Sequence, residues 1–279
     1  MKVIPKPIET AKQVFMDCIS TVAEIPLKRR LAWCQDEIEA AEIDFDIKFR
    51  SYQIYQMPQN LIILGKIGKK EMKSVYDYRM VTPGMPGNKH YNKIKSSAPF
   101  GKCPLCSVRI VDTLDHYLPK SKYPSLAVTP INLIPACTPC NKGKHIDVPS
   151  NDREQTLHPY YDNVENVSWI KGRVLQTNPI SFEYYVDCPV EWDQILKDRV
   201  KNHFDSFGIN EIFSAHANDE LRGARLQHIN LHNDNPNLLI DHLQEAFQSR
   251  LVLGINSWQA ILYSTLLNDN WFVNGGVLT

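Results

Sequence analysis

The sequence predicts an α+β protein that is mostly helical and has a short strand-containing segment near its middle. Apolar residues recur at three-to-four spacing from Ile8 to about Met57 and again from about Trp192 onward, which indicates helices toward both ends. Residues 167–176 and 180–188 are short runs rich in β-branched and aromatic residues, which is typical of strands. With 279 residues, 43% of them hydrophobic, the chain can form one or two domains with a sizeable core.

The charge balance excludes a strongly basic or acidic protein. The 31 basic residues equal the 31 acidic ones, so attraction to nucleic acid must come from a local patch. The chain has no run of about eighteen apolar residues, and its start, MKVIPKPIETAKQ, lacks the apolar core of a signal peptide. We therefore expect no membrane association and a cytoplasmic location. In that reducing compartment, seven cysteines are not expected to form a disulfide framework.

The N-terminal part of the chain, residues 1–95, is expected to be helical and to end in a basic segment. Within residues 66–102, nine basic residues stand against two acidic ones. These lysines could approach phosphates or could form an ordinary solvated face. Pro83, Gly84, Pro86 and Gly87 mark a loop inside this segment.

The central part, residues 96–150, contains two C-x-x-C pairs, Cys103/Cys106 and Cys137/Cys140, which lie about thirty positions apart. Four thiolates suit a tetrahedral Zn²⁺ site, and the short spacing lets one turn present both sulfurs of a pair. Because four sulfurs leave no open coordination position, we predict a structural zinc ion.

Strands and a helix are predicted around these cysteines. The stretch LDHYLPKS at residues 114–121 ends a first strand, and NLIPAC at residues 132–137 is a second, apolar strand. Thr138 and Pro139 in TPCNKGKH suit the start of a helix. Strand, loop, strand and helix therefore fall within one zinc-tied module.

This arrangement resembles the HNH family of ββα-metal endonucleases, in its zinc-binding C-x-x-C…C-x-x-C subtype, over about forty-five residues. The matching residues, in family order, are Asp115-His116, Asn132 and Asn141. The resemblance implies metal-dependent hydrolysis of phosphodiester bonds, in DNA rather than RNA. It implies that His116 is the general base and that Asp115 and Asn141 bind Mg²⁺ or Mn²⁺. By the same resemblance, Asn132 hydrogen-bonds the loop that orients His116.

Three points about this site depend on geometry. Neighbouring residues of a strand point to opposite faces, so Asp115 and His116 can act together only if the backbone bends there. Asn141 stands where many relatives have histidine, which favours a hard cation such as Mg²⁺ over a transition metal. His145, one helical turn later, is either a third metal ligand or a solvent-facing histidine near the helix end.

Three lysines near the motif are candidate nucleic-acid contacts. Lys120, Lys142 and Lys144 can neutralise backbone phosphates without reading sequence. They can equally be solubilising lysines on an exposed surface.

The C-terminal part, residues 151–279, is expected to contain a short β-hairpin that turns at Asn178-Pro179, followed by helices. The tract TLHPYYDNV at residues 156–164 is interpreted as a proline-centred turn with aromatic anchors rather than a second site built on His158 and Asp162. Together with this tract and the helical tail, the motif resembles the HNH subunits of anti-phage systems that pair a nuclease with an ABC-type ATPase, such as Septu. The remaining cysteines, Cys18, Cys34 and Cys188, are interpreted as small buried residues.

Two other functions are compatible with the sequence. A non-catalytic zinc ribbon that binds nucleic acid or protein would use the cysteines alone, whereas a base and two oxygen ligands beside them indicate catalysis. An RNase could use the same site, although no RNA-reading motif such as an RNP sequence is present.

Overall fold

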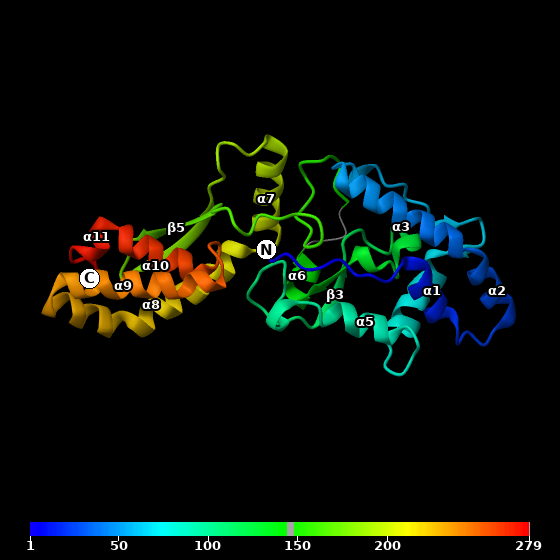
Figure 1. The fold of residues 1–279 in the computed structure, drawn as a ribbon, viewed down its shortest axis with the longest axis horizontal. Coiled ribbons are helices and arrows are strands. Elements are labelled where there is room, and N and C mark those ends of the chain that lie inside the picture. Colours follow the sequence, from blue (N-terminus) through cyan, green and yellow to red (C-terminus); the bar gives the residue numbers. More distant parts are fainter. Residues whose placement is uncertain (144–147, 279) are drawn as a thin grey trace. The chain divides into compact units, whose positions relative to one another are not determined.

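The computed structural model describes residues 1–143 and 148–278 (Figure 1). Helices hold 54% of the chain and strands 9%, which confirms the predicted mostly helical α+β class. The chain divides into two compact units, Met1–Asp162 and Asn163–Thr279. Among the described residues, no helix has both the length and the apolar character needed to cross a membrane.

The first unit consists of short helices and two small antiparallel ribbons. Its helices are α1 (Ala11–Ile19), α2 (Ile25–Trp33), α3 (Gln35–Arg50), α4 (Lys69–Ser74), α5 (Asn88–Lys95) and α6 (Thr138–Gly143). Its strands are β1 (Ile62–Ile63), β2 (Ile67–Gly68), β3 (Thr113–His116) and β4 (Leu133–Ala136). β1 pairs with β2, and β3 pairs with β4.

One hydrophobic core joins the N-terminal helices to the central strands. α1 begins with a capping box, because Thr10 accepts a hydrogen bond from the Gln13 N–H and the Gln13 side chain accepts one from the Thr10 N–H. The buried face of α1, which includes Phe15, packs in the same core as Leu114 of β3 and Leu133 of β4. The central module is therefore packed on the N-terminal helices.

The lysine-rich segment has helical stretches on both sides of a loop. α4 continues into a π-helical stretch, Val75–Met80, in which the Val81 N–H donates to the Tyr76 carbonyl five residues earlier, at 3.0 Å. The predicted loop follows at residues 81–87, and α5 comes after it. Both helices bury little apolar surface, with Met72 the buried residue of α4 and Ile94 the buried aliphatic residue of α5, so their periodicity in the sequence is weak.

The zinc-tied segment follows the predicted order of strand, strand and helix. Asp115 and His116 of β3 lie opposite Ile134 and Leu133 of β4. α6 begins at Thr138 and packs against β3, as Figure 1 shows. This placement brings the end of β3 and the first turns of α6 into one region.

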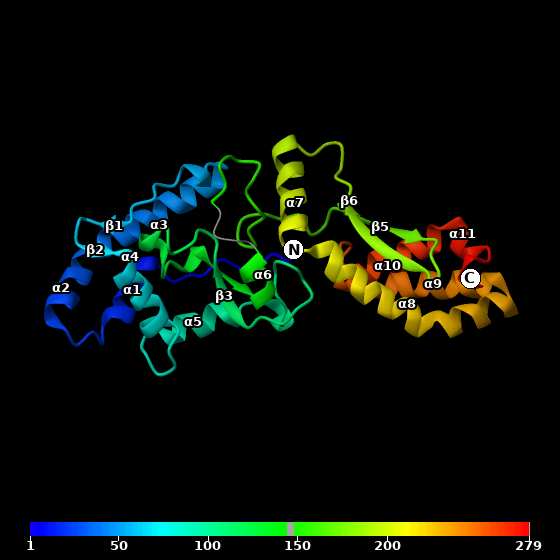
Figure 2. The ribbon, with the colours of Figure 1, turned by 180° about the vertical axis from the view of Figure 1, so that it is seen from behind.

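The second unit is a β-hairpin packed on helices (Figure 2). The strands β5 (Ile170–Leu175) and β6 (Ser181–Val186) pair antiparallel across the predicted turn. The helices are α7 (Gln194–Ser206), α8 (Ile209–Asp234), α9 (Pro236–Arg250), α10 (Trp258–Asn268) and α11 (Asn270–Val273). Gly172 of β5 allows close packing, since a Cβ there would lie 2.4 Å from the Phe182 ring. The hairpin precedes these helices in the sequence.

A buried histidine lies between the helices of the second unit. His228 of α8 is 1% exposed, and its ring centroid lies 5.4 Å from that of His242 on α9 and 6.0 Å from that of Phe272 on α11. The pKa of His228 is lowered to about 4, mainly by burial and also by the charge of His242, while Glu220 opposes the shift. In the unfolded chain a histidine has a pKa of about 6.5. Below that pH the unfolded chain therefore binds a proton that the folded chain excludes.

This difference predicts a loss of stability in acid. Neutral His228 contributes on the order of 3 kcal/mol to the free energy of unfolding above pH 6.5, and this contribution is lost as the pH falls toward about 4. Four of the five tryptophans lie in the second unit, so tryptophan fluorescence during urea unfolding reports mainly on it. His228→Leu should reduce the loss of unfolding free energy between pH 7 and pH 4.5. Equal pH dependence in the two proteins would contradict this assignment.

Candidate functional site

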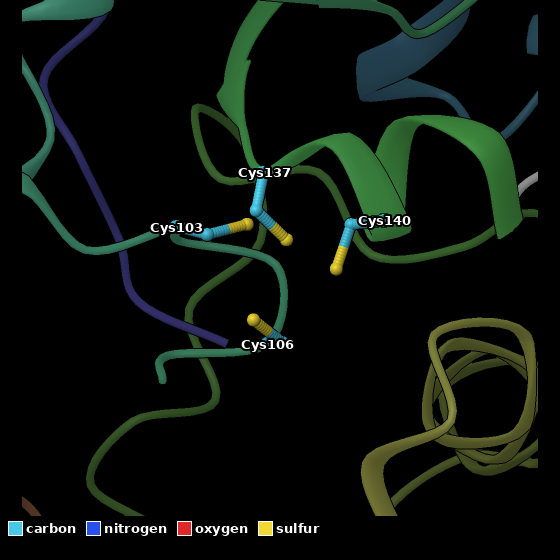
Figure 3. Close-up of side chains that lie close together, drawn as sticks. All are labelled: Cys103, Cys106, Cys137 and Cys140. Atoms are coloured by element: carbon cyan, nitrogen blue, oxygen red, sulfur yellow. The ribbon is translucent and has the colours of Figure 1, made fainter. Parts of the chain in front are cut away.

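The four predicted zinc ligands converge in the first unit (Figure 3). All four are buried, and their sulfur atoms lie within 4.8 Å of one another. A tetrahedral zinc site with Zn–S bonds of about 2.3 Å needs sulfur atoms about 3.8 Å apart, so this cluster could bind a zinc ion. The residues that would hold the ion are Cys103 and Cys106 from the loop before β3, Cys137 at the end of β4 and Cys140 in α6.

Short-range hydrogen bonds shape the turn that carries the first pair. The Cys103 N–H donates to the Arg109 carbonyl at 2.8 Å, and the Ser107 N–H donates to the Cys103 carbonyl at 2.7 Å. Ser107 adopts a φ of 63°, the left-handed conformation that closes the turn. The pKa of the Cys106 thiol is lowered by hydrogen bonds from the other three cysteines, most strongly from Cys103 and less from Cys137 and Cys140. This shift favours a thiolate at Cys106.

The other cysteines match the prediction in part. Cys18 of α1 and Cys34, which lies between α2 and α3, are both buried, and burial raises the pKa of Cys18 to about 12. Cys188, just after β6, is half-exposed, so its predicted burial is wrong. It lies beyond the end of the hairpin, where packing is incomplete.

A cleft of about 690 Å³ brings most of the predicted site residues together. Side chains of β3, of the loop after it and of α6 line it, namely Asp115, His116, Lys120, Asn141 and Lys142. The remaining lining residues that bear on its chemistry are Lys69, Lys70 and Lys73 of α4, Tyr76 of the π-helical stretch, and Ser121. Lys144 and His145 lie outside the described residues. The cleft therefore collects a carboxylate, a side-chain amide, a histidine and several lysines.

Asp115 and His116 line the same cleft although they are neighbours in β3. Asp115 is 5% exposed, and His116 is half-buried. The His116 Nε2 lies 2.8 Å from the Ala127 carbonyl. A carbonyl can only accept, so Nε2 carries the hydrogen, and in the neutral ring Nδ1 carries the lone pair.

Asn132 does not line the cleft but lies beneath the loop that follows β3. Its side chain is fully buried. Its Oδ1 accepts from the Leu118 N–H at 2.7 Å, and its Nδ2 donates to the carbonyls of Leu118 at 3.0 Å and Leu126 at 3.1 Å. Leu126 precedes Ala127, whose carbonyl contacts His116. Asn132 thus ties together the loop that holds the histidine ring.

Tyr76 is a site residue that sequence reasoning missed. Its ring lies edge to face with the His116 ring, with centroids 4.5 Å apart, and the Lys120 ammonium lies 3.9 Å from its centroid on a cation–π contact. Tyr76 is 5% exposed. It belongs to no motif, and its position within a basic segment was the one available signal.

Lys120 is held in place by neighbouring groups. Its ammonium donates to Asp77 Oδ1 at 2.9 Å. Burial lowers the pKa of Lys120, the hydrogen bond to Asp77 opposes this shift, and the nearby charge of Lys73 adds to it. Lys73 and Lys120 therefore lie close together on this side of the cleft, and Asp77 balances the charge of Lys120.

The tract TLHPYYDNV forms a buried turn, as predicted. The His158 N–H donates to Asp162 Oδ2 at 2.7 Å, and the His158 ring bonds the Ile131 carbonyl and the Tyr160 N–H. The ring packs among aromatic side chains of α3 and β3's following loop, including Phe49 and Tyr117. Both ring nitrogens are engaged within the fold, which is the arrangement of a structural histidine.

Comparison with known proteins gives two relatives. Protein ea31 of Escherichia phage lambda is 23% identical over 296 aligned residues, covering 99% of this chain and 100% of ea31. The Septu protein PtuB of Bacillus thuringiensis is 35% identical over 72 residues, covering 23% of this chain and 26% of PtuB. No protein-family model and no solved structure matches the chain. The chain is thus a distant full-length relative of ea31 and similar to PtuB over a short stretch.

Proposed function

We propose that the chain is a metal-dependent HNH-type endonuclease that hydrolyses phosphodiester bonds in DNA. The observation that carries this proposal is the cleft that contains Asp115, His116 and Asn141 together. The walls of the cleft include β3, the loop after β3 and α6, and the four-cysteine cluster joins α6 to the segment before β3. A zinc ribbon that only binds nucleic acid has no need for this combination of groups.

The donor set suits a hard divalent cation. The Asp115 carboxylate and the Asn141 amide oxygen are ligands that Mg²⁺ and Mn²⁺ prefer, and two protein ligands leave positions for phosphate and water oxygens. When bound, such a cation would stabilise negative charge on the scissile phosphate and its leaving oxygen.

The chain's own residues supply the proton transfer and its alignment. The Nδ1 lone pair of His116 can take a proton from the attacking water, because Ala127 holds the hydrogen on Nε2. The loop tied by Asn132 and the ring of Tyr76 restrict how the imidazole can turn. Lysines of the cleft can neutralise the phosphates that flank the reacting one.

A role in anti-phage defence and a partner subunit are also proposed. The partial match to the Septu protein PtuB supports the defence role. The resemblance to Septu-type HNH subunits adds an ABC-type ATPase as the expected protein partner, and co-purification with such a subunit would test it. The nucleic-acid partner is DNA in preference to RNA, which the following assay compares directly.

The test is a cleavage assay on the purified chain. Supercoiled plasmid and linear RNA are incubated with Mg²⁺, with Mn²⁺ or with a chelator, and zinc content is measured in each sample. We expect DNA cleavage that needs added cation and falls steeply in Asp115→Asn, which weakens a cation ligand. Asp112→Asn, an exposed carboxylate just before β3, should cleave like the wild type. Cleavage of RNA alone would indicate the RNase, and no cleavage of either would contradict the proposal.

A further inference from the structure

The short helix α4 turns a row of lysines toward the cleft. Lys69, Lys70 and Lys73 all line it, as expected for residues three and four positions apart on one helix face. The opposite side of α4 packs against the rest of the first unit. There Met72 is fully buried, and Glu71 accepts hydrogen bonds from Arg30 and from the Gly68 N–H, each at 2.8 Å.

The charge inside the cleft is strongly unbalanced. Its described lining residues include five lysines and a single carboxylate, that of the nearly buried Asp115. One of the five lysines, Lys120, forms an ion pair with Asp77, so four lysines stand against Asp115. This excess of positive charge occurs in a chain whose formal net charge is +0. The imbalance is therefore local, and a cleft of this kind concentrates the electric field that attracts an anion.

The lysines of α4 differ from other lysines of the same basic segment. On α5, Lys89 pairs with Asp17 at 2.8 Å, and Lys93 pairs with Glu9. Within residues 1–143 and 148–278, none of Lys69, Lys70, Lys73 and Lys142 forms an ion pair. The segment thus splits into lysines that stabilise the helices and lysines whose charge remains available in the cleft.

We propose that α4 is a phosphate-binding face, on which Lys69, Lys70 and Lys73, together with Lys142 of α6, hold the sugar–phosphate backbone of the nucleic acid in the cleft. This inference rests on the proposed function and adds to it the element that binds the substrate. A polyanion relieves the repulsion among these cations, and lysine contacts to phosphates carry no sequence information. Binding through α4 is therefore independent of base sequence and strongly weakened by salt.

A binding assay without added divalent cation tests this inference apart from catalysis. Labelled duplex DNA and single-stranded RNA of equal length are titrated at several salt concentrations against the full chain. We compare Lys69→Gln/Lys70→Gln/Lys73→Gln with Lys89→Gln/Lys93→Gln/Lys95→Gln on α5, which removes the same charge. The α4 variant should bind about 10- to 100-fold more weakly, and its slope of log affinity against log salt should be smaller by about 3. The α5 variant should stay within about threefold of the wild type.

Each outcome decides the inference. Equal weakening in both triple variants would show a general charge effect and overturn it, as would unchanged binding in the α4 variant. A wild type that binds neither probe overturns it too. Circular dichroism and zinc content show that the variants are folded. The assay contains no cleavage step, so weaker binding by the α4 variant would support the phosphate-binding role of α4 even if the chain proved unable to cleave DNA. If the chain cleaves DNA but its α4 variant binds normally, the proposed function stands and only this inference is wrong.

Discussion

Cys140→Ser should remove the zinc ion and lower the free energy of unfolding by about 5 kcal/mol or more. Serine is a poor zinc ligand, and the other three sulfurs would remain buried together without the ion that balances their charge. Structural zinc binding is worth about 10 to 16 kcal/mol in small zinc-finger peptides. The first unit has a hydrophobic core of its own, so we expect part of that value here. Metal analysis and guanidinium unfolding followed by circular dichroism measure the two effects.

The control is Cys188→Ser, the same substitution at a half-exposed cysteine of the second unit. It should keep about one zinc ion per chain and wild-type stability, because Cys188 is not part of the cluster. A Cys140→Ser protein that retained its zinc and its stability would show that the cluster does not depend on this ligand. Loss of the zinc ion in Cys140→Ser should also disturb the cleft, because α6 carries both Cys140 and the cleft residue Asn141.

His116→Ala should lower the single-turnover rate of Mg²⁺-dependent DNA cleavage by about 100- to 10,000-fold. The substitution removes the Nδ1 lone pair that the Ala127 contact leaves as the proton acceptor. It leaves Asp115, Asn141 and the lysines of the cleft in place, so DNA binding and zinc content should change little. Added imidazole should restore part of the rate by occupying the space of the missing ring.

The matched control is His216→Ala, an exposed histidine on α8 in the second unit. Its cleavage rate should equal that of the wild type. This result would show that the slower cleavage of His116→Ala comes from loss of the general base and not from removal of a histidine as such. A His116→Ala protein that cleaved within about threefold of the wild type would exclude His116 as the general base, because such a loss is far below that of a missing base. Failure of imidazole to restore any rate would argue instead that the substitution disturbs the loop.

Local features of the site could be predicted from sequence because their geometry is set over a few residues. A C-x-x-C pair presents two sulfurs from one turn, and two such pairs have few stable arrangements other than a common metal. The order of strand, strand and helix followed from apolar runs and from a proline near a helix start. The bounds of the helices α4 and α5 could not be predicted, because lysine-rich segments with few buried residues carry little periodicity.

The sequence by itself determined the four-cysteine cluster and the mostly helical α+β class, and it singled out five of the residues that line the cleft, namely Asp115, His116, Lys120, Asn141 and Lys142. Only the tertiary structure decided that the N-terminal helices share a core with β3 and β4 and that Tyr76 packs on His116. It also decided that the α4 lysines line the cleft, whereas Lys89 and Lys93 form ion pairs. The physical reason is distance along the chain. Tyr76 and His116 are about forty positions apart, so no local propensity links them, and their contact exists because burial of apolar surface brings the two segments onto one core.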